Sequence, residues 1–214
     1  MPEHDKRVAL VTGANRGIGY AISRRLGEQN ITGVLGARDP HKGTEACSRL
    51  QGEGLDAHFE LLDVIDEKSI KKAIENIRTH FGRLDILVNN AGIMIDGQED
   101  VRNVNPETIQ KTIQTNVMGP LMLCQCCIPL MQAGDYGRIV NMASTRTIFS
   151  VANTISMDII LITKIVDSGF QKGGSHGKTL STCYGIGNAY FCSRPHGGHH
   201  MCCRRKEYEG LGAG

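Results

Sequence analysis

The segment Thr12-Gly13-Ala14-Asn15-Arg16-Gly17-Ile18-Gly19 follows directly after the apolar run Val8-Ala9-Leu10-Val11. Such a run, bounded by polar residues and then by glycine, is typical of a parallel strand that is buried on both faces. Gly13 gives the turn after the strand its backbone freedom. Gly17 and Gly19 carry no side chain that would hold a phosphate group away from the backbone amides. The order of strand, glycine turn and helix therefore predicts a dinucleotide-binding opening.

A helix is expected from Ile18 to Glu28, with Ile18, Ile22 and Leu26 on one apolar stripe. The first amides of this helix have no partner inside the helix, and its N-terminus carries the positive end of the helix dipole. Both properties favour a phosphate group at this position.

Strands and helices alternate in the residues that follow. The sequence predicts strands at 31–35, 55–62, 84–88 and 138–142, and helices at 43–51, 67–81 and 106–131. This alternation favours an α/β fold, a Rossmann-type doubly wound parallel sheet in a single domain. Because right-handed crossovers bring the loops after the strands to one edge of the sheet, a cofactor site is expected there.

A set of short motifs occurs in the same order. After the glycine turn come Asp63 behind the third strand, Asn89-Asn90-Ala91-Gly92 behind the fourth, Asn116 in Thr115-Asn116-Val117, and Ser144 behind the fifth. With these motifs the chain resembles the short-chain dehydrogenase/reductase family over about residues 5–158. The resemblance implies an NAD(P)-binding oxidoreductase that moves a hydride to or from a carbonyl or an alcohol, and the pattern looks like that of the carbonyl reductases.

The resemblance also implies roles for particular residues. Ser144 would hydrogen-bond the substrate oxygen, and Asn116 would interrupt its helix and hold a water of the proton relay. Asp63 would contact the adenine ring, and the turn at 89–92 would support the sheet edge and line the cofactor site. The residues expected to bind the cofactor are Gly13, Asn15, Arg16, Gly17, Ile18, Gly19, Arg38, Asp63, Val64, Asn90, Ala91 and Gly92.

Each of these motif residues also has a purely structural interpretation. Asp63 could cap the third helix, and Asn89 and Asn90 could be ordinary turn residues. Asn116 could face the solvent from its helix, and Ser144 could simply end a strand.

The charges behind the second strand indicate which cofactor is preferred. An acid there binds the ribose hydroxyls of NAD, whereas a basic residue accommodates the 2′-phosphate of NADP. Here Arg16 and Arg38 supply guanidinium groups, which pair well with phosphate. We therefore predict NADP(H) as the preferred cofactor, with NAD(H) as the alternative because Asp39 follows Arg38. Both arginines could also be solvated surface charges.

The family's reaction further needs a tyrosine and, one helical turn later, a lysine. The tyrosine exchanges a proton with the substrate, and the lysine ammonium lowers the tyrosine pKa. At the usual positions beyond Ser144 this chain has Met157 and Leu161, which transfer no proton. Two later tyrosines are candidates. Tyr190 has Arg194 at the same helical spacing, although the sequence around it is poor helix material, and Tyr184 has Asn188 at that spacing, between glycines.

Residues 159–214 differ in composition from the rest of the chain. They contain seven Lys or Arg against three Asp or Glu, many glycines and a run rich in histidine and cysteine. The family's sixth strand, proline-glycine loop and final strand are not recognisable there. We interpret this segment as an atypical tail, either disordered or produced by a shifted reading frame or altered splicing, and we expect the late strands and helices of the fold to be missing.

The cluster of His196, His199, His200, Cys202 and Cys203 raises the question of a zinc site. Structural zinc usually recruits pairs of ligands from two separated places, whereas this cluster is local and flanked by glycine. We therefore expect no metal and attribute the cluster to the composition of the tail.

Length and composition fit one domain of a cytoplasmic protein. The chain has 214 residues and a formal net charge of +2, which gives no reason to expect a nucleic-acid partner. No apolar run is long enough to span a bilayer, and the charged start differs from a signal peptide. The expected partner is a small-molecule carbonyl or alcohol. Family members commonly form homo-oligomers, but the altered tail removes one of the helices that they use for assembly.

Three functions are consistent with these observations. The first is an NADPH-dependent reductase whose late half is altered in this chain, so that cofactor binding is expected more than turnover. The second is a non-catalytic protein that binds NADP(H) or interferes with dimers of an intact relative. The third is a non-productive truncated product, because an unpaired apolar sheet edge promotes aggregation.

Overall fold

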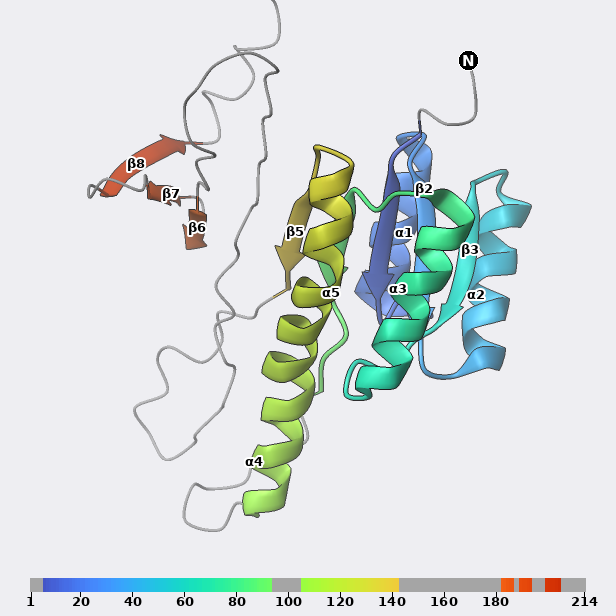
Figure 1. Ribbon diagram of the computed structural model, residues 1–214, viewed down its shortest axis with the longest axis horizontal. Coiled ribbons are helices and arrows are strands. Elements are labelled where there is room, and N and C mark those ends of the chain that lie inside the picture. The colour runs from blue at the N-terminus through green and yellow to red at the C-terminus, as the bar shows by residue number, and fades with distance from the viewer. Residues whose placement is uncertain (1–5, 94–104, 143–181, 187–188, 194–198, 205–214) are drawn as a thin grey trace, which may run out of the picture.

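The computed structural model describes residues 6–93, 105–142, 182–186, 189–193 and 199–204, and its main feature is a five-stranded parallel sheet (Figure 1). The strands are β1 (Val8–Thr12), β2 (Thr32–Ala37), β3 (Ala57–Leu61), β4 (Ile86–Asn89) and β5 (Arg138–Asn141). Their spatial order is β3-β2-β1-β4-β5. From β1 the chain first builds outward through β2 and β3 and then returns to add β4 and β5 on the other side. The predicted doubly wound fold is confirmed.

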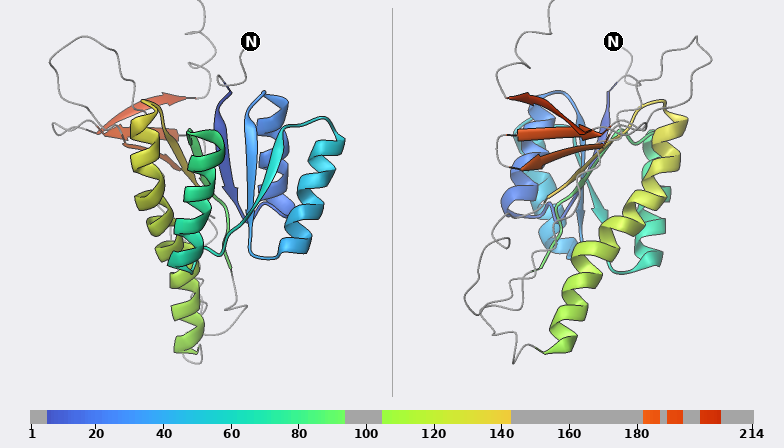
Figure 2. Two further views of the ribbon diagram at one scale, coloured as in Figure 1. Left: turned by 45° about the vertical axis from the view of Figure 1, so that its right-hand side comes forward. Right: turned by 90° about the vertical axis from the view of Figure 1, so that its left-hand side faces the viewer.

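Helices cover both faces of this sheet (Figure 2). One face carries α1 (Gly17–Glu28) and α2 (Pro40–Gly52), and the other carries α3 (Glu67–Phe81) and α5 (Gly119–Ala133). Between α4 (Pro106–Ile113) and α5 lies the π-helical turn η2 (Gln114–Met118). The helix expected at 106–131 is therefore interrupted. Within the described ranges, no helix is both long and apolar enough to cross a membrane.

The central strand β1 contributes to two hydrophobic cores, because its side chains alternate between the faces of the sheet. Val8 and Leu10 pack with the residues of α3 and α5, whereas Ala9 and Val11 pack on the side of α1 and α2. The expected apolar stripe of α1 is only partly correct. Ile22 and Leu26 pack against the core, but Ile18 is 63% exposed. Ile18 lies in the first turn of α1, beyond the edge of the sheet, and does not reach the core.

Three further strands lie in the tail. The strands β6 (Thr182–Ile186), β7 (Ala189–Ser193) and β8 (His199–Arg204) form a separate antiparallel sheet in the order β6-β7-β8. None of them joins the parallel sheet, in which β5 pairs only with β4. In the part of the chain that the structure describes, the parallel sheet thus ends at β5, without the late strands that the family would add.

A buried carboxylate fixes the amino end of β1. Asp85 is 1% exposed, and its Oδ2 accepts hydrogen bonds from the backbone N–H of Val8 at 2.8 Å and from Nε of Arg83 at 2.9 Å. Its Oδ1 accepts a second bond from Nη2 of Arg83 at 2.6 Å. The bidentate pair with Arg83 holds the carboxylate in place, and the bond from the Val8 N–H ties the segment before β4 to the start of β1.

Replacing this carboxylate should destabilise the fold. We expect Asp85→Ala to lower the free energy of unfolding by about 3 kcal/mol, because the amide of Val8 and the Arg83 guanidinium lose a charged acceptor in a largely buried place. Urea denaturation followed by circular dichroism measures the change. Glu45→Ala, at an exposed position of α2, is the control. Equal midpoints for the two variants would contradict the assignment.

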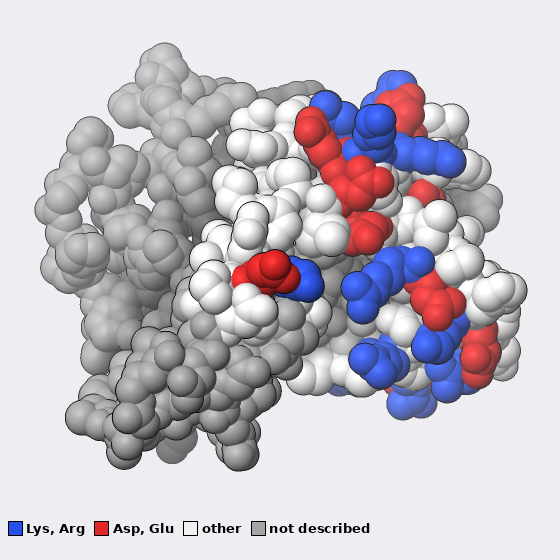
Figure 3. Space-filling model, turned by 90° about the horizontal axis from the view of Figure 1, so that it is seen from below, with Lys and Arg blue, Asp and Glu red and all other residues white. Residues whose placement is uncertain are grey.

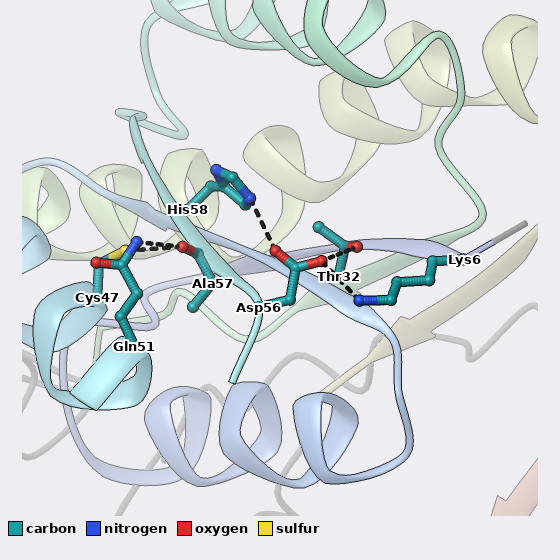
Figure 4. A network of polar contacts seen from close by, with 7 residues as sticks. All are labelled: Lys6, Thr32, Cys47, Gln51, Asp56, Ala57 and His58. Atoms are coloured by element: carbon teal, nitrogen blue, oxygen red, sulfur yellow. Dashed lines mark hydrogen bonds and ion pairs between the residues drawn. The ribbon is translucent and has the colours of Figure 1, made fainter. Parts of the chain in front are cut away.

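A second polar network lies at the same amino edge, around Asp56 just before β3 (Figure 4). The Oδ2 of Asp56 accepts a hydrogen bond from Oγ1 of Thr32 at 2.7 Å and lies 3.5 Å from Nζ of Lys6, while its Oδ1 lies 3.0 Å from Nε2 of His58. Burial raises the pKa of Asp56, but the hydrogen bonds from Thr32 and His58 outweigh burial, so the net pKa lies below its ordinary value.

The lowered pKa of Asp56 sets the sign of a pH effect. The stabilisation of the fold by the ionised Asp56 is fully present above the ordinary aspartate pKa of about 3.9. It is lost as the pH falls through the lower pKa that Asp56 has in the folded state. Because this side chain is partly exposed, Asp56→Ala should cost less than about 1 kcal/mol at pH 7. Urea denaturation at pH 7 and pH 3 should show the difference from the unchanged chain shrinking at the lower pH. A difference that grows at pH 3 would refute this account.

Candidate functional site

A cavity of about 530 Å³ lies at the carboxyl edge of the parallel sheet, where the loops after β1, β2, β3 and β4 meet. Figure 3 shows the molecule from this edge, where Lys and Arg side chains alternate with Asp and Glu on the described part of the surface. The residues that line the cavity are Gly13, Asn15, Arg16, Gly17, Ile18, Ala37, Arg38, Asp39, Lys42, Leu62, Asp63, Val64, Ile65, Asn90, Ala91, Gly92, Ile93 and Thr115.

All the residues predicted to bind a cofactor line this cavity except Gly19. Gly19 is buried, and a Cβ atom on it would lie 2.5 Å from Nδ2 of Asn90 and 2.6 Å from the carbonyl oxygen of Gly13. The structure thus shows a packing reason for glycine at this position, and the role of Gly19 beside a phosphate stays a prediction. Gly19 allows α1 to pack closely against the turn after β1 and the loop after β4.

The other two glycines of the turn line the cavity and have the backbone freedom expected of them. Gly13 and Gly17 have φ angles of +65° and +57°, which L-residues with a side chain rarely adopt. A Cβ atom on Gly17 would meet no atom within 4 Å, so the backbone here faces open space at the cavity. Glycine at this position leaves the backbone accessible to a ligand.

The N-terminus of α1 at the cavity has no side-chain cap. Its N-cap residue, Arg16, makes no side-chain hydrogen bond to the helix, and the first turn contains no acid. By contrast, Asp39, Asp66 and Asn105 cap α2, α3 and α4 through their side-chain oxygens. The first amides of α1 are thus available to an anion in the cavity.

The hydroxyl of Thr12 holds the two loops that border the cavity centre. Its Oγ1 accepts hydrogen bonds from the backbone N–H of Asn90 at 3.0 Å and of Ala91 at 2.9 Å, and lies 3.4 Å from the carbonyl oxygen of Val88. Nδ2 of Asn90 donates back to the carbonyl of Thr12 at 2.9 Å. Asn90 is therefore more than an ordinary turn residue, because its amide fixes the end of β1.

Asn89 precedes it and is buried at the end of β4. Its Nδ2 donates to Oδ1 of Asn141 at 2.7 Å, which links the carboxyl ends of β4 and β5. Asn89 does not line the cavity and supports the sheet edge, as the resemblance implied.

Asn116 lies in the π-helical turn η2, and its side chain is hydrogen-bonded to the protein. Its side-chain amide donates to the carbonyl of Ile93 at 2.8 Å and accepts from the N–H of the same residue at 2.9 Å. Both ends of the amide are thus used to hold the loop after β4. The expected interruption of the helix is present, since η2 lies between α4 and α5.

Three basic side chains line the cavity, and Asp39, the acid next to Arg38 in the sequence, is already hydrogen-bonded. Arg16, Arg38 and Lys42 are all exposed. Asp39 accepts a hydrogen bond from the N–H of Lys42 at 3.1 Å and lies 3.5 Å from its Nζ. The bond from the Lys42 N–H keeps the pKa of Asp39 below its ordinary value. Asp39 therefore acts as the helix cap of α2, and the guanidinium of Arg38 has no recorded ionic partner within the described residues.

Asp63 follows β3 and lines the cavity but does not cap a helix. Its Oδ1 accepts a hydrogen bond from the N–H of Ile65 at 3.2 Å, and its own N–H donates to Oγ of Ser69 at 3.0 Å. The cap of α3 is Asp66, whose Oδ1 accepts from the N–H of Lys68. The capping interpretation of Asp63 is therefore wrong.

The predicted catalytic residues are not brought together in the described part of the chain. Ser144, Met157, Leu161 and Arg194 lie outside the described residues. Tyr190 lies in the strand β7, which excludes a helical spacing from Tyr190 to the residue four positions later. The clustered His196 also lies outside the described residues, and no group of three or more metal-binding side chains is found within them.

The sequence prediction lacks several residues that line the cavity, namely Lys42, Ile65, Ile93 and Thr115. It also assigns no role to Thr12, whose hydroxyl holds the loop after β4. The sequence does contain a local pattern that points to Lys42. Asp39 and Pro40 mark the start of a helix, and Lys42 lies in its first turn, close to the sheet edge where the helix begins. No local signal identifies Thr115 or Ile93, whose positions depend on long-range packing.

Comparisons with known proteins agree with this geometry. The family model described as short chain dehydrogenase matches residues 7–156. The (+)-neomenthol dehydrogenase of Arabidopsis thaliana is 41% identical over 165 residues, which are 68% of this chain and 56% of that protein. Carbonyl reductase [NADPH] 1 of Sus scrofa is 45% identical over 143 residues, covering 65% of this chain and 47% of that protein.

A solved structure also matches. A metagenomic short-chain oxidoreductase in complex with NADP is 33% identical, with a TM-score of 0.64, and the match covers 70% of this chain and 67% of that one. The chain spans about half the length of the curated relatives that it matches. Since the family match runs from the start of β1 to beyond β5 and the same fold recurs in the solved relative, the chain belongs to the short chain dehydrogenase family.

Proposed function

We propose that this chain binds NADP(H) in the cavity at the carboxyl edge of the sheet. It is an oxidoreductase of the kind that transfers a hydride between this cofactor and a small-molecule carbonyl or alcohol, but its own turnover is lost with the tyrosine-lysine pair. The proposal rests on one observation above all: an uncapped helix N-terminus and three basic side chains surround the same cavity. When bound, the cofactor supplies or accepts the hydride, and the residues of the chain bind and orient it.

The pyrophosphate would be held by the start of α1. The backbone at Gly17 is open to the cavity, and the following amides have no partner from a capping side chain. Helix N-termini with free amides and a positive dipole end attract anions. The apolar side chain of Ile18, exposed in the same turn, offers a surface for a ring of the cofactor.

The 2′-phosphate of NADP(H) would be bound by Arg38 and Lys42, with Arg16 from the glycine turn. Asp39 is engaged by Lys42 and by the start of α2, so it is not free to accept the ribose hydroxyls of NAD. The names of two matched proteins support this choice, since one is a carbonyl reductase [NADPH] and the other was solved with NADP. NAD(H) is the secondary cofactor in this proposal.

The proton transfer is the step for which this chain lacks the usual residues. Met157 and Leu161 stand where the family has its tyrosine and lysine. Ser144 is proposed to bind the substrate oxygen and Asn116 to keep the loop after β4 in place. Tyr190 is the alternative proton donor, and its position in the strand β7 does not support a helical spacing to Arg194.

This substitution of the catalytic pair favours a second candidate function. A chain that keeps the cavity but lacks the proton donor would bind NADP(H) without turnover, and could compete with an intact relative in homo-oligomers. A homo-oligomeric state and a cytoplasmic location both stay predictions from the sequence.

Removing the two cations behind β2 should change which cofactor binds. Arg38→Ala combined with Lys42→Ala should weaken NADPH binding at least about ten-fold, because charge-assisted hydrogen bonds to phosphate are lost, and should leave NADH binding nearly unchanged. Isothermal titration calorimetry with both cofactors measures the two dissociation constants.

The matched control removes two arginines at the far end of α1. Arg24→Ala combined with Arg25→Ala deletes the same charge at the opposite edge of the sheet. This control should bind both cofactors like the unchanged chain. Equal losses for NADPH and NADH in the cavity variant would argue against a 2′-phosphate site.

Binding and turnover should separate in this protein. We expect NADPH to bind, while NADPH oxidation with a panel of aldehydes and ketones stays at the background rate, since no tyrosine-lysine pair is available. Absorbance at the NADPH band measures turnover, and calorimetry measures binding on the same preparation. If turnover is found, Ser144→Ala and Tyr190→Phe decide which hydroxyl it needs. A chain that neither binds NADPH nor turns it over would contradict the proposed function.

A further inference from the structure

We propose that Ser69 is a positioning residue of the cofactor site: it holds the loop after β3 in the shape that receives the adenosine 2′-phosphate half of NADP(H). This inference rests on the proposed function of the same cavity. Ser69 does not line the cavity and has no place in the family motifs quoted for this chain. It acts through Asp63.

The contact is a single hydrogen bond to the backbone of the loop. Ser69 lies in the first turn of α3 and is half-buried, and its Oγ accepts the N–H of Asp63 at 3.0 Å. The cap of this helix is Asp66, so the Ser69 hydroxyl is not needed for capping. Serine in a first helical turn usually bonds its own helix or the solvent, whereas here it reaches back across the turn to the loop.

The other polar groups of the loop are used elsewhere. The N–H of Leu62 donates to the carbonyl of Ala37 at 3.0 Å, and the carbonyl of Asp63 accepts from the N–H of Asp66 at 3.3 Å. The side chain of Asp63 accepts from the N–H of Ile65 at 3.2 Å. Ser69 is thus the recorded partner of the Asp63 N–H, and without its hydroxyl this amide would have to find a new acceptor.

A second contact limits where the loop can go. A Cβ atom on Gly119, at the start of α5, would lie 2.8 Å from the carbonyl oxygen of Val64 and 3.2 Å from its Cβ. The loop is therefore in close contact with α5 on one side and is hydrogen-bonded to Ser69 at the start of α3. If the bond to Ser69 is lost, the loop cannot relax toward α5 and has to shift into the cavity or along its wall.

The strand order identifies the half of the cofactor that this loop would contact. In the sheet, β3 is the neighbour of β2, and the loop after β2 carries Arg38 and Lys42. The loop after β4, with Asn90 and Ile93, lies on the other side of β1. The loop held by Ser69 therefore lies next to the cations proposed to bind the 2′-phosphate. A change in the shape of this loop should not alter how tightly the nicotinamide half of the cofactor binds.

The test compares three ligands with the full chain and three variants. Ser69→Ala removes the hydroxyl, Ser69→Thr keeps it, and Ser48→Ala removes a hydroxyl from an exposed position of α2 as the matched control. Calorimetry measures the dissociation constants of NADPH and of each half of it, adenosine 2′,5′-bisphosphate and reduced nicotinamide mononucleotide. Hydrogen exchange of the Asp63 amide, followed by NMR without any ligand, reports the contact directly.

We expect Ser69→Ala to weaken NADPH and adenosine 2′,5′-bisphosphate binding about five-fold, the size of one lost hydrogen bond. It should leave the mononucleotide unaffected and speed exchange of the Asp63 amide. Ser69→Thr should restore both readouts, and Ser48→Ala should change neither. A general loss of stability would instead speed exchange throughout the core and weaken all ligands.

Two results would each overturn this inference but leave the proposed function intact. One is unchanged exchange of the Asp63 amide in Ser69→Ala. The other is unchanged NADPH affinity of Ser69→Ala when the unchanged chain binds NADPH. Failure of the unchanged chain to bind NADPH would overturn the proposed function, and this inference with it. The two failures are thus distinguishable in one set of titrations.

Discussion

The parallel pairing of β1 on both of its sides is the constraint on which the cavity depends. Because β1 pairs with β2 and β4, and these pair with β3 and β5, every strand ends at the same edge of the sheet. The loops that follow four of these strands line one cavity. The side chains of β1 alternate between two cores, so the strand cannot slip by one residue without exposing both sets. The position of Thr12 at its end is fixed for the same reason.

Short hydrogen bonds then turn this edge into a defined site. The hydroxyl of Thr12 joins the end of β1 to the loop after β4, and Asn116 in η2 holds the next part of that loop. Ser69 holds the loop after β3. In each case a side chain from one element satisfies backbone groups of a loop that has no regular partner. Such bonds contribute little to global stability individually, but they decide the shape of a loop.

The amino edge of the sheet serves stability, and the carboxyl edge serves the site. At the amino edge, Asp85 and Asp56 accept several hydrogen bonds each and connect the starts of adjacent strands. At the carboxyl edge, the exposed groups are the cations of Arg16, Arg38 and Lys42 and the uncapped amides of α1. Because the two edges have separate tasks, the cavity depends on the loops at the carboxyl edge, all of which come before the tail at 159–214.

The sequence by itself determined the doubly wound sheet, the glycine turn and nearly all of the residues around the cavity, because buried strands, glycines and helix starts leave local patterns of spacing and composition. It also placed Met157 and Leu161 where the family has a tyrosine and a lysine, and the loss of the catalytic pair stays a prediction from these positions. Only the tertiary structure decided that Gly19 packs closely against Asn90 and Gly13, that Asp66 and not Asp63 caps α3, that Ser69 bonds back to the loop after β3, and that Asn116 holds the loop after β4. These facts depend on atoms brought within hydrogen-bonding or van der Waals distance by the packing of separate elements, and no local pattern in the sequence encodes such a distance.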